Sequence, residues 1–311
     1  MGFAHLTVLL EETISLLQVR QGGLYVDGTL GGGGHTRALL EASQPDGRVV
    51  AIDQDRMALD YAREWGKPYA HRLQLVKGNF RHLPQLLGYI GIERVDGVIC
   101  DLGVSSPQLD EGERGFSYQH DAVLDMRMDE MANFTAKDLL NTWDQVDLTR
   151  VFRDYGEEKW SARVAERVVQ ARQRKPLATT GELVDVIKAA IPAAARRTGP
   201  HPARRIFQAL RIAVNDELGA LRDLLEAVPS CLNAGGRVAV ITFHSLEDRM
   251  VKKAFQYEAK ECVCPPHTPK CVCGHKAQLN VITRRPVQAG EEELDANPRA
   301  RSAKLRVAEK L

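Results

Sequence analysis

The most restrictive feature of this sequence is a glycine-rich run near its N-terminus. Residues 27–35 read Asp-Gly-Thr-Leu-Gly-Gly-Gly-Gly-His and follow the apolar pair Tyr25 and Val26. Glycine carries no side chain that could hold a ligand, so such a run lets the backbone turn sharply and come close to a bulky molecule. The spacing fits neither the dinucleotide fingerprint G-x-G-x-x-G nor the phosphate loop G-x-x-x-x-G-K-[ST], which argues against NAD and ATP.

An acidic residue ends each of the first two predicted strands. Asp27 follows the first strand, and Asp53 ends the strand at 48–53. A carboxylate at the end of the second strand is well placed to accept hydrogen bonds from a ribose diol. We therefore predict a ligand with a ribose but without a pyrophosphate, a description that S-adenosylmethionine satisfies. The alternative is a glycine-rich surface turn with an N-capping aspartate.

Short apolar strands alternate with helices through the first third of the chain. After a first strand from Leu24, we predict strands at 48–53, 73–77 and 95–101, with helices at 56–64 and 83–89. This alternation implies a parallel sheet covered by helices on both faces. Helical periodicity marks 135–140, 147–155, 159–173 and 180–190, and strands return at 237–243, 279–283 and 304–307 around a helix at 245–257. We predict an α/β, Rossmann-like sheet domain from residues 1–115 and 206–311, with an inserted all-helical domain at 116–205.

Composition sets broad limits on the class of protein. The chain has 311 residues, of which 44% are hydrophobic and 27% charged, enough for one large or two moderate cores. No apolar run approaches the ~18 residues of a membrane span, and the N-terminal segment lacks the pattern of a leader peptide. We therefore expect a cytoplasmic protein without a membrane partner.

The charged residues are unevenly distributed. The formal net charge is only +1, but residues 159–211 hold 12 Lys or Arg against 3 Asp or Glu, so this segment carries +9 and the rest of the chain −8. A compact basic segment in an otherwise acidic chain is the pattern expected of a polyanion site. Solvated helix faces are the alternative, since Arg163, Arg167 and Arg174 recur at near-helical spacing.

Polar motifs follow four of the predicted strands, at residues 27–35, at Asp53, at 101–108 and at 243–249. In open α/β sheets the ligand crevice lies outside the carboxyl ends of the strands. Each motif alone has a simpler explanation, because Asp101, His244 or Ser245 could merely cap a helix. The convergence of all four on one sheet edge favours a binding site.

These segments also carry a resemblance that runs almost end to end. The chain resembles the bacterial ribosomal RNA small-subunit methyltransferase H family, which methylates the exocyclic N4 of a cytidine in the decoding region of 16S rRNA. The matching segments are 5–12, 27–35, 51–53, 101–109, 112–117, 124–129, 155–158, 205–215, 243–249 and 297–302. The resemblance implies a class I S-adenosylmethionine-dependent methyltransferase sheet and a substrate in the small ribosomal subunit.

The resemblance also implies cofactor contacts from Gly33, Gly34, His35, Asp53, Phe80, Asp101 and Gln108. The first three would face the methionine part of the cofactor, Asp53 the ribose hydroxyls and Phe80 the adenine. Judged from the sequence alone, Phe80 is equally well an ordinary core aromatic. Gly32 stands where some relatives carry a larger side chain, which should matter little in a turn.

Methylation of N4 is a displacement by a poor nucleophile, because the amino lone pair is delocalised into the cytosine ring. Alignment should supply much of the catalysis, together with an acceptor for the amino hydrogens. Asp101 is the predicted acceptor, since its place ahead of Ser105-Ser106-Pro107 resembles the acidic or polar residue and proline turn of other amino-methyltransferases. Gln108 replaces their aromatic residue, so the alternative is that Asp101 serves only the cofactor.

A base must leave its stack to reach such a pocket, and the flanking RNA must then be held. Arg196, Arg197, Arg204 and Arg205 flank prolines in a predicted loop of the basic segment, and we predict that they bind RNA phosphates.

Six cysteines raise a separate question. Cys262, Cys264, Cys271 and Cys273 form a compact tetrad with His267 and His275 nearby. Four thiolates could bind zinc, although C-x-C is tighter than the usual spacing. A metal-free thiol loop and redox pairing are the alternatives, and disulfides are disfavoured in a reducing cytosol. We assign Cys100 and Cys231 to core packing.

Two other functions fit parts of the sequence. A DNA or small-molecule methyltransferase could use the same sheet, and a non-catalytic RNA-binding or assembly factor could use the basic segment. The intact strand-end motifs argue against the second of these. The sequence leaves open the oligomeric state and whether the substrate is free RNA or an assembled subunit.

Overall fold

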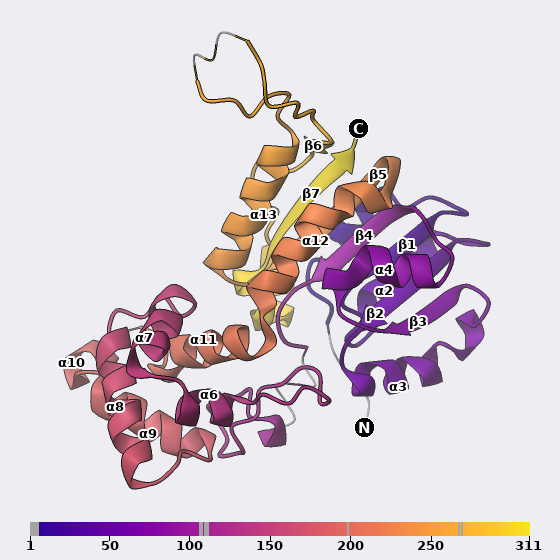
Figure 1. Cartoon of the computed structure of the whole chain (residues 1–311). Helices are drawn as coiled ribbons and strands as arrows, with labels where there is room; N and C mark the ends of the chain where they lie inside the picture. Colours follow the sequence, from indigo (N-terminus) through magenta and orange to yellow (C-terminus); the bar gives the residue numbers. More distant parts are fainter. Residues whose placement is uncertain (1–5, 106–107, 109–111, 198, 267, 269) are drawn as a thin grey trace. The chain divides into compact units, whose positions relative to one another are not determined.

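The computed structural model describes residues 6–311 except 106–107, 109–111, 198, 267 and 269. Five residues of the motifs above lie outside the described residues, namely His5, Ser106, Pro107, Leu109 and His267. The chain forms two compact units (Figure 1). The sheet unit comprises the residues up to Gly103 and from Gly219 onward, and the helical unit comprises Val104–Leu218.

The sheet unit is built on seven strands in the order β3-β2-β1-β4-β5-β7-β6. Strands β1 to β5 run parallel, and β7 pairs antiparallel with β5 and β6. The predicted α/β fold is confirmed, and β3 and β4 have the predicted bounds. The strands are β1 (Leu24–Asp27), β2 (Arg48–Asp53), β3 (Leu73–Lys77), β4 (Val95–Asp101), β5 (Leu232–Thr242), β6 (Leu279–Val281) and β7 (Lys304–Lys310).

Helices cover both faces of this sheet, because successive side chains of the central strands point to opposite faces. Val26 and Val98 pack in one core with α4, α12 and α13, whereas Tyr25 and Ile99 pack in another with α1 and α2. Cys100 and Cys231 lie buried in the first core, which confirms their predicted packing role. The helices are α1 (Leu10–Leu17), α2 (Gly34–Ala42), α3 (Arg56–Trp65), α4 (Leu83–Tyr89), α12 (Glu217–Cys231), α13 (Ser245–Glu258) and α14 (Glu291–Ala296).

Strand β5 starts at Leu232, earlier than the predicted start at 237. The early part contains Gly235, with φ of +75°, and the pairing with β4 shifts register between Val95 and Gly97. An irregularity of this kind breaks the alternation of apolar residues, so the pattern in the sequence revealed only the regular half of the strand.

The helical unit is held by a core that includes Phe152, Leu139 and Leu210. Two of its helices begin with capping boxes, Thr135 with Asp138 and Thr179 with Glu182, in which side chains and backbone amides satisfy one another. Its main helices are α6 (Ala136–Thr142), α7 (Gln145–Asp154), α8 (Ser161–Arg174), α9 (Thr180–Ala190), α10 (Ala193–Arg196) and α11 (Ala203–Asn215).

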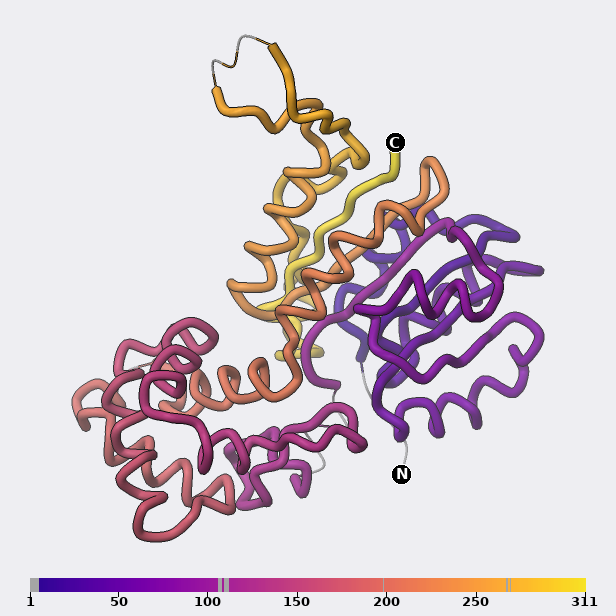
Figure 2. Tube along the Cα trace, in the orientation of Figure 1, coloured from indigo at the N-terminus to yellow at the C-terminus, as the bar shows by residue number. Residues whose placement is uncertain are grey.

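The chain leaves the sheet after β4 and returns to it in α12 (Figure 2). The units divide at 103/104 and 218/219, whereas the sequence suggested 115/116 and 205/206. Residue 205 lies within α11, whose buried side chains on both sides of it, Ala203 and Ile206, pack in the core of the helical unit, so all of α11 belongs to that unit.

Helices in this protein are short. The longest in the described part of the chain, α12, has 15 residues, and a membrane span needs about 20. No described helix is long and apolar enough to cross a membrane.

Candidate active site

The glycine run forms a tight turn between β1 and α2, and neighbouring side chains require several of its glycines. Gly33 has φ of +77°, in the left-handed region that favours glycine. A Cβ at Gly33 would lie 2.3 Å from the Trp65 ring, and one at Gly34 would lie 1.7 Å from Thr7 Oγ1. A Cβ at Gly32, in contrast, would have no described atom within 4 Å. Packing therefore shapes the turn at 33 and 34, and a ligand can approach its backbone at 32.

Asp53 ends β2 beside this turn, as predicted. Its Oδ2 accepts a hydrogen bond from the Gly31 amide at 2.9 Å, and its Oδ1 accepts one from the Asp55 amide at 2.8 Å. Burial raises the pKa of Asp53 to about 6, although these two hydrogen bonds act in the opposite direction. Each carboxylate oxygen has a second lone pair, so ribose hydroxyls can still donate to it. That contact stays a prediction.

Asp101 ends β4, and its carboxyl group is only partly satisfied by the chain. Its Oδ2 lies 3.9 Å from Nδ1 of the buried His35, and its Oδ1 is buried with no hydrogen-bond partner among the described residues. Burial, reinforced by the charges of Asp27 and Glu247, raises the pKa of Asp101 well above its ordinary value. Burying a polar atom without a partner is costly, so this oxygen marks a place where a ligand group is expected.

Asp27 ends β1 and is fully buried. Its Oδ2 accepts a hydrogen bond from Thr36 Oγ1 at 2.6 Å, and its Oδ1 accepts one from the Thr29 amide at 3.0 Å. Burial raises its pKa as well. Asp27 therefore fixes the turn to the start of α2 and also adds negative charge near Asp101.

Helix capping accounts for most of the polar residues in the segment after β5. His244 is the N-cap of α13, and it forms a capping box with Glu247, whose Oε2 accepts hydrogen bonds from the Phe243 and His244 amides at 2.9 and 3.2 Å. The capping alternative is thus confirmed for His244, whereas Ser245 is the first helical residue. Asp248 pairs with Arg306 on β7 at 2.6 Å. Glu247 still contributes a buried charge that acts on Asp101.

Phe80 and Gln108 stand in different surroundings. Phe80, at the start of a short helix after β3, is partly buried against the sheet core and lies close to Gly28. Gln108 belongs to the helical unit, where its side-chain oxygen accepts a hydrogen bond from the Ser105 amide at 3.1 Å. Their cofactor contacts remain predictions.

The four predicted RNA-binding arginines are all exposed, but they do not form one loop. Arg196 ends α10 and Arg197 follows it, whereas Arg204 and Arg205 lie in the first turn of α11, so the predicted loop is wrong for the latter pair. No described carboxylate forms an ion pair with any of the four. Basic residues in the first turn oppose the helix dipole, so helix stability does not explain them.

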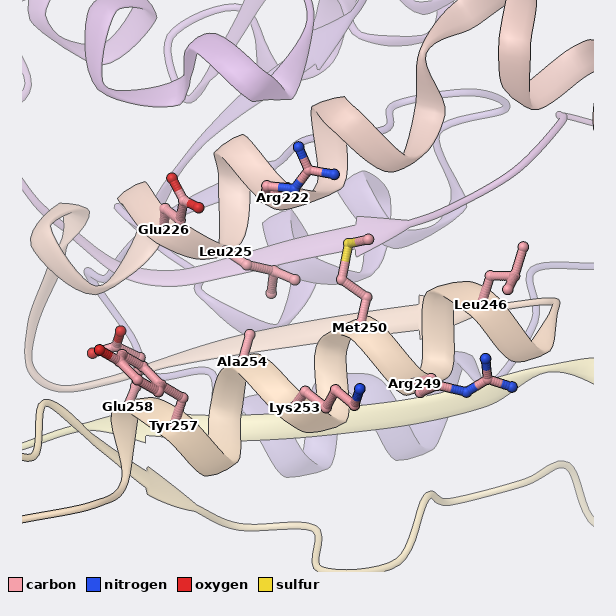
Figure 3. Close-up of a pocket in the computed structure, with 10 residues that line it drawn as sticks. All are labelled: Arg222, Leu225, Glu226, Leu246, Arg249, Met250, Lys253, Ala254, Tyr257 and Glu258. Carbon is pink, nitrogen blue, oxygen red and sulfur yellow. The ribbon is translucent and has the colours of Figure 1, made fainter. Parts of the chain in front are cut away.

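A separate groove of about 740 Å³ lies between α12 and α13 (Figure 3). Leu225, Met250 and Ala254 give it an apolar lining, and Arg249 and Lys253 add positive charge. None of the predicted cofactor residues lines it. The motif at 243–249 thus contributes Glu247 to the acidic strand ends and Arg249 to this groove.

The strand-end residues of the sheet unit fit S-adenosylmethionine. Its sulfonium carries a positive charge, which would relieve the repulsion among the carboxyl groups of Asp27, Asp101 and Glu247. The partnerless Oδ1 of Asp101 and the open backbone at Gly32 leave places for ligand atoms. Asp53 would take the ribose hydroxyls.

The strand order, the glycine turn after β1 and the acidic strand ends together define a class I S-adenosylmethionine-dependent methyltransferase. Residues 2–311 match the MraW methylase family, and the chain belongs to this family.

Relatives of similar length are close in sequence. A ribosomal RNA small subunit methyltransferase H of Brevibacillus brevis is 57% identical over 311 residues, which are 100% of this chain and 99% of that protein. The proteins of the same name from Paenibacillus sp. and Clostridioides difficile are 54% and 50% identical, over 99% and 100% of this chain and 100% of each relative.

Sequence reasoning missed the roles of Asp27 and Glu247. Asp27 was visible only as a strand-ending acid, and Glu247 only as a helix-capping acid, because the sequence does not reveal that both charges act on Asp101. The signal that could have pointed to them is their position: Asp27 ends β1, and Glu247 lies in the first turn of the helix that follows β5. The four cysteines of the tetrad do come together, in the loop between α13 and β6.

Proposed function

We propose that this protein transfers a methyl group from S-adenosylmethionine to the exocyclic N4 of a specific cytidine in the decoding region of 16S rRNA. Family membership supports methyl transfer, and the names of the 50–57% identical relatives support small-subunit rRNA as the substrate. The observation that carries the choice of an amino group is Asp101, a strand-ending carboxyl group with a raised pKa and a buried oxygen that lacks a partner. A cytoplasmic location and an assembled or assembling subunit as substrate are part of the same proposal.

Asp101 acts in this proposal as the acceptor for the amino protons. When the cofactor is bound, it supplies a methyl group made electrophilic by the sulfonium. Positive charge develops on N4 as its lone pair attacks, and a carboxylate in a dry site stabilises that charge strongly. Because its pKa is raised, Asp101 is a stronger base than an exposed aspartate and can take the proton at the end of the reaction.

His35 is suited to position Asp101. Its Nδ1 lies 3.9 Å from Asp101 Oδ2, and the ring is buried in the first turn of α2. When protonated, the imidazole would hold Asp101 in its ionised form. Asp53 and the turn would meanwhile hold the cofactor.

The helical unit is proposed to hold the RNA on either side of the target base. A cytidine extruded from its stack loses stacking energy, and contacts to flanking phosphates compensate for this loss. The exposed guanidinium groups of Arg196, Arg197, Arg204 and Arg205 are suited to bind phosphate oxygens.

The deciding experiment uses small ribosomal subunits from cells that lack the corresponding gene. The protein is incubated with these subunits and labelled S-adenosylmethionine, and the digested RNA is analysed by mass spectrometry. We expect N4-methylcytidine at a single site, and the D101N variant should form it at least about 100-fold more slowly. Label on another atom or another nucleoside would refute the proposed chemistry.

Substrate competition separates the rival functions. Excess DNA should not reduce labelling of the subunits, and free 16S rRNA tests whether assembly is needed. If DNA competes as well as RNA, the fold and the cofactor stand but the substrate class is different. Absence of cofactor binding would instead favour a non-catalytic RNA-binding protein.

A further inference from the structure

Among its described residues, the loop between α13 and β6 has few contacts besides those of its cysteines that could hold it together. It spans residues 259–278 and projects beyond the end of α13 (Figures 1 and 2). Its base is anchored, because the Gln278 amide donates to Glu258 O at 2.8 Å and the His275 ring contacts Tyr257. Farther out, no described residue of the loop is buried, and Val272 is 83% exposed. A loop of this length without an apolar core needs another source of order.

The four thiols of this loop lie closer together than packing requires. All four sulfur atoms lie within 4.8 Å of one another, although they come from two chain segments, Cys262-x-Cys264 and Cys271-x-Cys273. The Cys262–Cys271 and Cys271–Cys273 sulfur distances are 3.4 and 3.5 Å, and the Cys262–Cys273 and Cys264–Cys271 distances are 3.8 and 4.0 Å. Each sulfur is thus near several others rather than paired with one.

These distances match a tetrahedral metal site. A zinc–sulfur bond of about 2.3 Å in a tetrahedron places neighbouring sulfur atoms about 3.8 Å apart. The four distances given above, 3.4–4.0 Å, lie around that value and far above the ~2.05 Å of a disulfide bond, and the whole set lies within 4.8 Å. The sulfur arrangement therefore fits one shared ion better than two redox pairs.

The backbone near the sulfurs is arranged to support thiolates. The Cys264 amide donates to Cys262 Sγ at 3.4 Å, and the Val272 amide donates to Cys264 Sγ at 3.5 Å. Hydrogen bonds of this kind offset the negative charge of metal-bound thiolates and orient them. His275 is occupied at the loop base, where its Nε2 lies 3.2 Å from Tyr257 O.

We propose that Cys262, Cys264, Cys271 and Cys273 bind one zinc ion, which orders this loop. Four protein ligands fill the coordination sphere and leave no position for substrate, so the site is structural. The loop then has a fixed shape despite its lack of a core, and the metal takes no part in methyl transfer.

The test measures metal in the full-length protein, purified under reducing conditions without a histidine tag. Inductively coupled plasma mass spectrometry should find about one zinc per chain in the wild type. The double variant C262S/C271S should hold none. V272A, which changes the exposed residue between two of the cysteines and keeps all four thiols, should hold as much as the wild type.

Two further measurements guard against misfolding of the serine variant. Cobalt(II) added to metal-free wild type should give the visible absorption of tetrahedral thiolate coordination, and V272A should give the same spectrum. A chelator should speed tryptic cleavage after Lys270 in the wild type and leave cleavage of C262S/C271S unchanged. Stoichiometric iron, disulfides under reducing conditions, or reduced protein that takes up no zinc on reconstitution would overturn the proposal.

Discussion

The strand ends of the sheet unit and the four exposed arginines of the helical unit carry opposite charges in opposite environments. Asp27, Asp53 and Asp101 are desolvated, and their pKa values are raised. Arg196, Arg197, Arg204 and Arg205 are exposed, although Arg196 also donates to Ile191 O and Arg205 to Glu157 O. Buried charges interact strongly and at short range, whereas exposed charges are screened by salt. The sheet unit should therefore respond to pH, and the helical unit to ionic strength.

The largest effect is expected from D101N. Loss of a general base lowers turnover by about 10²–10⁴-fold, whereas affinity for S-adenosylmethionine should change less than about threefold. Initial rates on small subunits and calorimetric titration of the cofactor measure the two quantities.

The matched control is D96N, at the opposite end of the same strand. Asp96 accepts hydrogen bonds from the Leu24 amide, Arg20 and Asn233, and although desolvation acts against them, these partners lower its pKa. Its loss should reduce thermal stability and spare turnover. An equal loss of turnover and cofactor affinity in D101N would assign Asp101 to the cofactor instead.

Replacing the four arginines Arg196, Arg197, Arg204 and Arg205 with alanine should have the next largest effect. RNA affinity should fall roughly 10–100-fold, and the slope of log affinity against log salt should become shallower by about 3, because each lost phosphate contact removes about 0.7. Filter binding at several salt concentrations measures both quantities, and cofactor affinity should not change.

Alanine at Arg163, Arg167 and Arg174 is the control for this prediction. These residues are exposed on α8, where a solvated helix face is the simpler explanation. If this triple variant weakens RNA binding as much as the quadruple variant, the RNA surface lies on α8 as well. Unchanged affinity in the quadruple variant would place the RNA elsewhere.

The third effect is a dependence of cofactor affinity on pH. The pKa of Asp53 is about 6 in the folded protein and 3.8 ordinarily, so the proton is held more tightly in the folded state. Folding stability should therefore fall as pH rises from about 4 to 6. Cofactor affinity should instead rise with pH, because the ionised carboxylate accepts ribose hydrogen bonds better than the protonated acid does. Below pH 6 the affinity should drop by up to about tenfold for each pH unit. Calorimetry between pH 7.5 and 5.5 tests this, and D53N should lack the step near 6.

The smallest expected effect is a difference in stability between alanine variants of two adjacent glycines. Gly33→Ala would need a left-handed backbone and would meet the Trp65 ring, so it should lower stability by about 1–2 kcal/mol. Gly32→Ala enters open space and should leave thermal stability unchanged. Thermal unfolding of both variants measures this difference. Equal melting temperatures would mean that the turn is not fixed by its packing on Trp65.

Much of the sheet unit could be predicted because local pattern and global fold agree there. The bounds of β3, β4 and α4 follow from apolar runs that end in polar residues, and the acids at the strand ends mark the site. Helices α11 and α12 were not among the elements predicted from the sequence. The chain joins them through Asp216, with φ of +47°, so no proline or glycine at the junction marks where one ends and the other begins.

The residues of the candidate site could be predicted from the sequence, but the electrostatic interactions among them could not. The raised pKa of Asp101 comes first from its burial and then from the charges of Asp27 and Glu247, which are distant in sequence and act on it only in the folded protein. Gly33 and Gly34 were predicted to face the cofactor. Their packing on Trp65 and Thr7 could not be predicted, because residue spacing in the sequence does not reveal these contacts. The convergence of the four thiols likewise depends on the loop conformation.

Single-turnover methylation of small subunits, measured against subunit concentration, tests the division of labour most directly. Wild type, D101N and the quadruple arginine variant are compared with cofactor in excess. We expect the arginine variant to reach the wild-type rate at saturating substrate, because only binding is weakened, whereas D101N stays slow at every concentration. Recovery of D101N at saturation, or an equal deficit in the arginine variant there, would contradict the assignment of chemistry to the sheet unit and RNA binding to the helical unit.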